Sequence, residues 1–406
     1  MENTQATRPV SSEQHAAVST MNSDLAARLD PLTTAIFNRI ADGALSIDEL
    51  VRLFANEFNT TEEHVKLATA MFLEGPLKGD EVVRNAPTPD CSCDLVWVKG
   101  IAARCDWRIP DEFPEGLGYR SCPPPAGFKI PGFFRNDLIE NPQTYCSIKE
   151  GDIVWVNLAW IRSFIKDVLP CIKTDFILVT GDCDFSPPSS IMAEALQLLE
   201  CPRLIHWYAQ NCDAPGFMDR MSPLPIGLDF HTLSQKTYWR EKNISTPVQQ
   251  EQLLRSVRAQ LPPTRERIRK VYIDFAWQPS YLYPPERRRD ILKRLLWNKA
   301  VAFQSKPLPR TELWRRWGEY AFVLSPHGFG LDCHRTWEAL ACGHIVLVPS
   351  SPLDSLYEGL PVIPISDWNA ITDRNLDMWL EKYSGCDINA EKLTSAYWIN
   401  RMRQGV

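Results

Sequence analysis

The stretch that decides the fold is FVLSPHGFGLDCHRTWEALACGHIVLV, residues 322 to 348. An apolar segment of strand length, 321–324, ends at Ser325 and Pro326 and passes into a turn. The spacing then predicts a helix over 332–341 and a second apolar strand over 345–348. A buried strand, a short turn, a helix and another buried strand form the repeating unit of a parallel sheet covered by helices.

The turn contains Gly328 and Gly330, which allow positive φ and the close approach of a ligand to the backbone. We expect Asp332 to cap the helix that follows, and the first N–H groups of this helix point back toward the turn. A helix start of this kind binds anions, and phosphate in particular. Together with Ser325, the two glycines are therefore predicted to form a phosphate-binding turn.

Three charged or polar side chains follow at helical spacing. His334 and Glu338 are four residues apart, and Arg335 and Glu338 are three apart, so they lie on neighbouring faces of the helix. The guanidinium suits the charge of a diphosphate, and the carboxylate suits the hydroxyls of a ribose. The alternative is an ordinary turn between strand and helix with a surface salt bridge.

Working outward, further apolar strands alternate with helical stretches on both sides of this unit. The fold class is therefore α/β, with two Rossmann-like lobes preceded by a small helical N-terminal segment. The expected strands are 153–156, 176–179, 204–208 and 271–275, and the expected helices are 161–168, 191–199 and 285–297.

The string SPHGFGLDCHRTWEAL resembles the C-terminal half of exostosin-like glycosyltransferases with the GT-B fold, and the similarity continues through SSPLDSLYEGLPV to Asp367 and Trp368. Weaker islands are TGDCDFSPP (180–188), WYAQNCD (207–213) and LPIGLDF (224–230). The resemblance implies a two-lobed enzyme whose second lobe holds a nucleotide-sugar donor, with the acceptor bound between the lobes. It further implies that Arg335 neutralises the diphosphate, that Glu338 holds the ribose, and that no metal is required.

Two further positions are candidate donor contacts. Arg287 lies in an arginine run at the start of an expected helix, where the resemblance implies a phosphate-binding Arg. Ser351 follows the strand over 345–348, at the carboxyl edge where ligands of such sheets gather. Its alternative role is a simple turn or capping residue.

Inverting transfer needs a general base, and we expect the first lobe to supply it. Asp184 is the first choice and Asp182 the second, because both follow an apolar strand. His206, Asp213, Asp229 and His231 are also available. Asp182 and Asp184 also form an Asp-x-Asp pattern, which resembles the metal-holding motif of GT-A glycosyltransferases. A third alternative is a nucleotide-sugar-binding or glycan-binding protein without catalysis.

The amino-acid composition indicates how the rest of the chain is organised. Residues 1–22 are expected to be a disordered tail and 23–90 an acidic helical module, since residues 1–90 hold 14 Asp and Glu against 7 Lys and Arg. Residues 91–260 would form the N-terminal acceptor lobe, and 261–406 the C-terminal donor lobe. No run approaches the roughly 20 apolar residues of a membrane-spanning helix.

The expected small molecules and partners follow from these features. They are a UDP- or GDP-linked sugar donor with no further cofactor and no metal, a glycan or glycoconjugate acceptor, and a protein that binds residues 23–90. Nucleic acid is not expected, although residues 262–316 hold 14 Lys and Arg against 5 Asp and Glu, because no recognised module surrounds them. We expect a cytoplasmic location, with peripheral membrane association as the alternative.

Overall fold

The computed structural model describes residues 93–109, 142–235, 238–243, 245–275, 288–304, 306–384 and 390–404. The chain divides into two compact units, 1–83 and 84–406, and every described residue belongs to the second. The tail expected over 1–22 and the helical module expected over 23–90 therefore lie outside the described residues.

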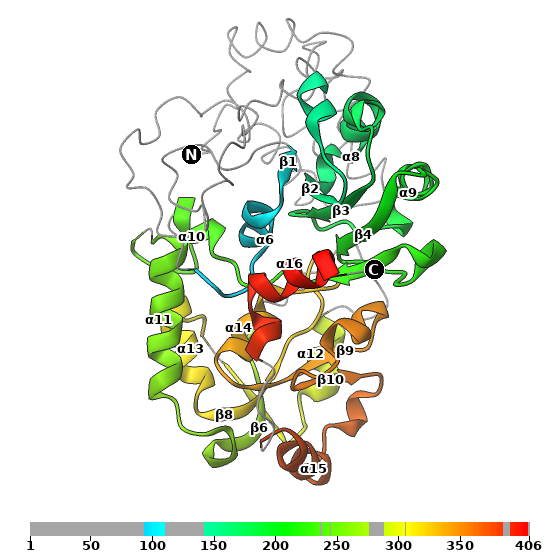
Figure 1. Cartoon of the computed structure of the whole chain (residues 1–406). Helices are drawn as coiled ribbons and strands as arrows, with labels where there is room; N and C mark the ends of the chain where they lie inside the picture. Colours follow the sequence, from blue (N-terminus) through cyan, green and yellow to red (C-terminus); the bar gives the residue numbers. More distant parts are fainter. Residues whose placement is uncertain are drawn as a thin grey trace, which may run out of the picture. The chain divides into compact units, whose positions relative to one another are not determined.

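Two five-stranded parallel sheets form the framework of this unit, and they confirm the α/β class with two Rossmann-like lobes (Figure 1). The first sheet has the order β1-β2-β3-β4-β5 and the second the order β10-β9-β8-β6-β7. The strands of the first sheet are β1 (Trp107–Ile109), β2 (Asp152–Asn157), β3 (Phe176–Gly181), β4 (Leu204–Gln210) and β5 (Met221–Leu224). Those of the second are β6 (Ile268–Ile273), β7 (Val301–Phe303), β8 (Tyr320–Leu324), β9 (Ile345–Pro349) and β10 (Val362–Ile365).

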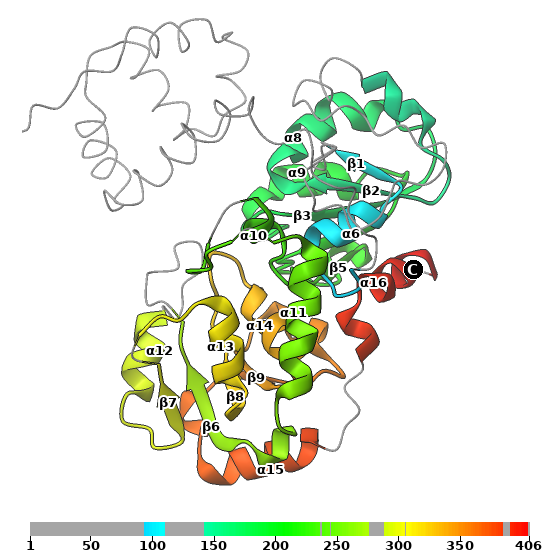
Figure 2. The same cartoon turned by 90° about the vertical axis from the view of Figure 1, so that its left-hand side faces the viewer.

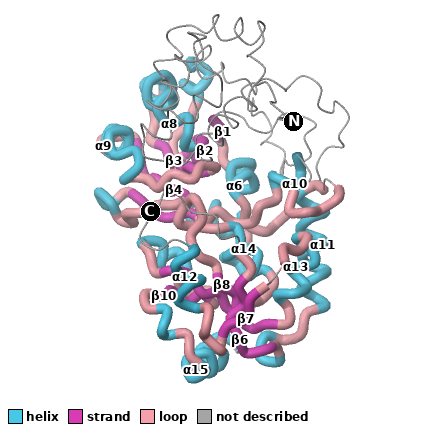
Figure 3. The backbone as a smooth tube through the Cα atoms, turned by 180° about the vertical axis from the view of Figure 1, so that it is seen from behind, coloured by secondary structure: helices cyan, strands magenta, loops and turns pink. Residues whose placement is uncertain are grey.

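The central strands are buried on both faces because helices cover both sides of each parallel sheet. All six residues of β3 and all five of β9 are buried. Figure 3 shows the strands of each lobe as a separate group between helices. The helices are α6 (Val98–Arg104), α8 (Ile161–Ser163), α9 (Met192–Leu199), α10 (His231–Gln235), α11 (Pro247–Gln260), α12 (Arg288–Leu295), α13 (Arg310–Trp317), α14 (His334–Ala341), α15 (Asp373–Ser384) and α16 (Ser395–Gln404).

Two helices pack away from the sheet that their place in the sequence suggests. Helix α11 follows the last strand of the first sheet, but it packs against α13 and α14 of the second lobe (Figure 2). The last helix, α16, crosses back to the first lobe, where it packs against α6 and Ser395 Oγ donates to the carbonyl of Leu95 at 3.2 Å. The two lobes are thus joined by exchanged helices as well as by loops.

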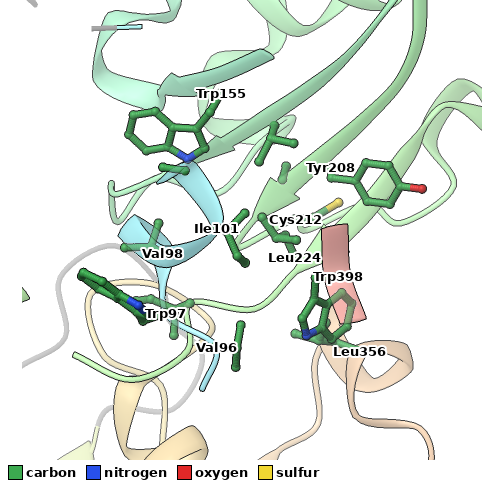
Figure 4. Close-up of a cluster of buried hydrophobic side chains, with 14 of the residues drawn as sticks. Val96, Trp97, Val98, Ile101, Trp155, Tyr208, Cys212, Leu224, Leu356 and Trp398 are labelled. Atoms are coloured by element: carbon green, nitrogen blue, oxygen red, sulfur yellow. The ribbon is translucent and has the colours of Figure 1, made fainter. Parts of the chain in front are cut away.

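A continuous apolar core runs between the lobes at the place where α16 returns. Trp398 of α16 lies in the same buried cluster as Leu356 of the second lobe and Leu224 of β5 (Figure 4). Trp97 and Ile101 extend this cluster along α6. Burial of such side chains stabilises the joint by roughly 1.5–3 kcal/mol for each large apolar group.

The segment before α6 is fixed by a second close backbone contact. Gly227 pairs with Trp97 in an antiparallel bridge, and the amide of Leu228 donates to the carbonyl of Val96 at 2.8 Å. Gly227 has a φ of +68°, and a Cβ atom there would lie 2.2 Å from the carbonyl oxygen of Val96. Only glycine fits this position.

Gly227→Ala is therefore expected to lower the free energy of unfolding by about 3 kcal/mol or more, because the positive φ and the backbone clash add. Gly151→Ala is the matched control, because Gly151 has a φ of +74° with nothing within 4 Å of an added Cβ atom. The control should lose only the conformational part, about 1 kcal/mol. Urea unfolding of both variants measures this difference, and equal losses would contradict the close contact.

Candidate functional site

The turn between β8 and α14 begins at a fully anchored serine. The amide of Ser325 donates to the carbonyl of Leu347 at 2.8 Å, and the Thr336 hydroxyl lies 2.9 Å from Ser325 Oγ. Ser325 is buried. It therefore holds the end of β8 against α14 rather than presenting its hydroxyl to solvent, and its predicted part in binding the donor remains a prediction.

The two glycines of the turn differ in their surroundings. Neither uses the positive φ that glycine allows. A Cβ atom on Gly330 would lie 2.4 Å from Asn211 Nδ2, so the close approach at this position is to a side chain of the first lobe. Gly328 is partly exposed, and Gly330 is buried. Gly328 is therefore the glycine of this turn that a ligand can reach.

Asp332 does not cap the helix, and this expectation was wrong. Helix α14 begins at His334, and its N-cap residue is Cys333. The buried Asp332 carboxylate instead accepts four hydrogen bonds: from the amides of Ile226 at 2.8 Å and Cys333 at 2.9 Å, from the Trp337 indole at 2.8 Å and from the Tyr357 hydroxyl at 3.0 Å. The donor from Ile226 belongs to the first lobe, so the carboxylate joins the lobes.

The first two residues of α14 are both partly exposed. His334 Nδ1 lies 2.8 Å from the carbonyl of Gly227. Because a carbonyl oxygen can only accept, Nδ1 carries the proton in the neutral ring and Nε2 keeps its lone pair. The Arg335 guanidinium forms an ion pair with Asp274, which follows β6.

Glu338 is held in a buried network. Its carboxylate forms an ion pair with Arg310, and its Oε2 accepts from the indole of Trp314 at 3.0 Å. Arg310 also donates to Gln250 Oε1 at 2.8 Å and lies 4.4 Å from the ring centroid of Trp239. Both carboxylate oxygens of Glu338, the expected ribose contact, therefore already accept hydrogen bonds from the protein. Arg335 and Glu338 have different partners rather than each other.

The first lobe contributes two carboxylates from the loop after β3. Asp182 has a φ of +57°, accepts from the Lys99 ammonium at 2.5 Å and accepts from Asn157 Nδ2 at 3.1 Å. Asp184 is exposed, and partial burial by the surrounding protein raises its pKa while the nearby His334 acts to lower it. The structure thus brings Asp184 of the first lobe close to His334 of the second.

The loop after β5 adds a histidine and an aspartate that the sequence offered only as further candidates. His231 Nδ1 lies 3.0 Å from Asp229 Oδ1. The His231 and His334 rings come from different lobes, and their centroids are 6.0 Å apart. Asp182, Asp184, His231 and His334 therefore gather where the carboxyl ends of both sheets meet, which is where open parallel sheets bind ligands.

Ser351 and Arg287 are the other two predicted donor contacts. Ser351 caps the 3-10 helix Pro352–Tyr357, where its hydroxyl accepts from the amide of Leu353 at 3.2 Å. Arg287 lies outside the described residues. Its neighbour Arg288 donates from Nε to the carbonyl of His327 at 2.8 Å and so supports the glycine turn.

The sequence analysis did not identify the charged residues that form ion pairs with the candidate site residues. Asp274 directly follows the end of β6, so the edge argument used for Asp182 could also have identified it. Lys99 and Arg310 gave no comparable signal, because each lies on a helix far in sequence from the carboxylate that it contacts.

Asp182, one of the two carboxylates of the GT-A-like alternative, is already paired with a cationic side chain. The described residues contain no group of three or more His, Cys, Asp and Glu side chains placed to hold a metal ion. The Lys99 ammonium occupies Asp182 Oδ2, which the GT-A-like alternative assigns to a cation. An ammonium and a divalent cation would repel each other there.

No protein-family model matches the chain, and a comparison with curated proteins gives no match either. Among solved structures, the chain is similar to a trehalose-6-phosphate synthase (10% identity, 68% of this chain and 79% of that chain, TM-score 0.36). It is also similar to an E. coli structure described as trehalose-6-phosphate bound with UDP-2-fluoro glucose (10% identity, 68% and 80%, TM-score 0.33). A third is a UDP-forming α,α-trehalose-phosphate synthase from Burkholderia vietnamiensis (12% identity, 68% and 77%, TM-score 0.29).

TM-scores below 0.5 add nothing to the architecture that the strand order already gives. The resemblance to exostosin-like enzymes and the site residues assigned from it stay predictions. In the part of the chain that the structure describes, no helix is both long and apolar enough to cross a membrane.

Glu338→Ala tests the buried network. Because Arg310 would be left buried and unpaired, we expect the free energy of unfolding to fall by about 3–5 kcal/mol. The double variant Arg310→Met/Glu338→Ala should lose less than Glu338→Ala alone, since it buries no unpaired charge. Chemical denaturation of the three proteins measures this. A double variant less stable than Glu338→Ala would contradict the assigned pairing.

Proposed function

We propose that this protein is a glycosyltransferase that moves a sugar from a UDP- or GDP-linked donor to a hydroxyl of a glycan or glycoconjugate, inverting and without a metal. One observation carries the proposal. The partly exposed start of α14 lies at the carboxyl edge of the second sheet, and the acidic and imidazole side chains of the first sheet's carboxyl edge face it.

The proposed donor site is supported by the charges and the backbone N–H groups at the start of α14. The first N–H groups of α14 have no acceptor within the helix, and the helix dipole places partial positive charge there. Gly328, His334 and Arg335 are the partly exposed members of the predicted donor set around this helix start. A diphosphate in contact with them would meet backbone donors, a guanidinium and an imidazole that can be protonated.

The ion pair between Arg335 and Asp274 is compatible with this role. Asp274 also accepts from the Trp317 indole at 2.8 Å, and the guanidinium lies 5.7 Å from the Trp317 ring centroid. These contacts hold Arg335 in one orientation before a ligand arrives, which lowers the entropy lost on binding. A guanidinium has five N–H donors, so phosphate oxygens can share it with Asp274.

The proposed acceptor site is supported by side chains of the loop after β3. Next to Asp184, the Phe185 side chain is 42% exposed. An exposed aromatic ring beside carboxylates suits a sugar, because the ring packs against C–H groups and the carboxylates accept from hydroxyls. This combination favours a glycan acceptor over a nucleic acid, whose phosphates the carboxylates would repel.

A panel of nucleotide-sugars tests the proposal by thermal shift and transfer assays. At least one UDP- or GDP-sugar should raise the melting temperature of the wild-type protein and support transfer in the presence of EDTA. Arg335→Ala should abolish the donor-induced shift. Arg335→Lys should keep part of it, because an ammonium retains the charge but not the planar fork.

Arg162→Ala is the matched control. Arg162 is 61% exposed in its side chain and pairs with Glu194 on α9, outside the predicted donor set. This variant should keep the full shift. The proposal fails if no nucleotide-sugar shifts the wild-type protein, or if Arg335→Ala and Arg162→Ala respond alike.

A further inference from the structure

An aspartate and a histidine of the first lobe lie close together at the junction, outside the predicted donor set. Asp229 is 5% exposed and follows β5, and His231 is the first residue of α10. The Asp229 carboxylate accepts from the Thr232 amide at 3.0 Å and from the Thr232 hydroxyl at 2.8 Å. These bonds fix the carboxylate, which lies 3.0 Å from His231 Nδ1.

The protonation states of the pair differ. Burial acts to raise the pKa of Asp229, but His231, His334 and Arg310 outweigh it and bring this pKa down to about 2. Burial lowers the pKa of His231, opposed by Asp229 and Asp182 and assisted by Lys99 and His334. Near neutral pH the carboxylate is therefore ionised, and the imidazole is neutral and able to accept a proton.

The nearby carboxylate also favours one tautomer of the ring through its charge, since the contact lies within ion-pair distance but lacks the alignment of a hydrogen bond. An anion facing Nδ1 favours the form with the proton on Nδ1, which leaves the lone pair on Nε2 at the opposite side of the ring. The His231 side chain is 22% exposed, and His334 lies across from it in the other lobe. An accessible, correctly protonated base thus stands opposite the predicted donor site.

We propose that His231 is the general base of sugar transfer and that Asp229 is its positioning residue. This inference rests on the proposed function. His231 Nε2 takes the proton of the acceptor hydroxyl while that oxygen forms a bond to the anomeric carbon of the donor. The bond from the anomeric carbon to the diphosphate oxygen breaks, its electron pair leaves with the nucleoside diphosphate, and Asp229 stabilises the imidazolium.

His231 suits this task better than Asp184, the first choice from the sequence. A general base is most effective when its pKa lies near the working pH, and an imidazole is closer to that value than a carboxylate. Asp184 is exposed; partial burial and the neighbouring Asp182 raise its pKa, and His334 acts to lower it, but no hydrogen bond fixes its orientation among the contacts of the described residues. Its position next to Phe185 fits contact with the acceptor instead.

The test measures kcat/KM against pH together with the donor-induced thermal shift, for the full chain with the nucleotide-sugar found active in the panel. His231→Ala should lower kcat by about 10²–10⁴-fold, keep the donor shift and lose the acid limb of the profile. Asp229→Asn should retain intermediate activity. Its acid limb should move to lower pH, because the variant lacks the anion that raises the pKa of His231.

His206→Gln is the matched control. His206 is also a buried histidine of the first lobe, and its Nε2 lies 2.9 Å from the Ser222 hydroxyl, outside the proposed machinery. This variant should keep the profile of the wild-type protein.

Near wild-type transfer by His231→Ala would overturn the inference while leaving the proposed function intact. Loss of the donor shift in His231→Ala would also overturn it, because the histidine would then bind the donor. An unmoved acid limb in Asp229→Asn would overturn the positioning role. Absence of any donor shift or transfer in the wild-type protein would overturn the proposed function, and this inference with it.

Discussion

The Asp332 carboxylate is the constraint on which the arrangement of the site depends. Asp332 lies in the segment between β8 and α14. Its carboxylate accepts a hydrogen bond from the amide of Ile226, so it fixes the second sheet to the loop after β5. Burial raises its pKa, although the hydrogen bonds from Ile226, Trp337 and Tyr357 act to lower it. A buried carboxylate is tolerated only with such partners, and because the donor from Ile226 crosses from the first lobe, it ties the two lobes together.

The same contact between the lobes explains why the candidate side chains lie close together at the junction. Asn211 accepts from the amide of Asp332 at 2.9 Å and packs against Gly330, which brings the end of β4 to the turn after β8. The charges near the junction are paired in advance: Arg335 with Asp274, Lys99 with Asp182 and Arg310 with Glu338. Such pairing holds side chains in place before substrate binds, which is the condition for electrostatic stabilisation of a transition state.

The sequence predicted the fold better than the site. Strands at 153–156, 176–179, 204–208 and 345–348 were confirmed, because buried parallel strands appear as continuous apolar runs. It missed β5, β7 and β10: Pro223 and Pro364 interrupt the apolar pattern of the edge strands β5 and β10, where proline is tolerated, and β7 is only three residues long. Asp332 was assigned to the wrong role because its decisive partner, Ile226, is far away in sequence. Local spacing can place a side chain on a helix face but cannot identify its partner across a fold.

A crystal structure of the protein with bound UDP or GDP tests the central claim most directly. The account predicts that the β-phosphate oxygens accept hydrogen bonds from the backbone amides of His334 and Arg335 at the start of α14 and from the Arg335 guanidinium. The Asp229 and His231 side chains should face the phosphate from the first lobe. A diphosphate held through a metal ion on Asp182 and Asp184, or bound away from the start of α14, would contradict the account.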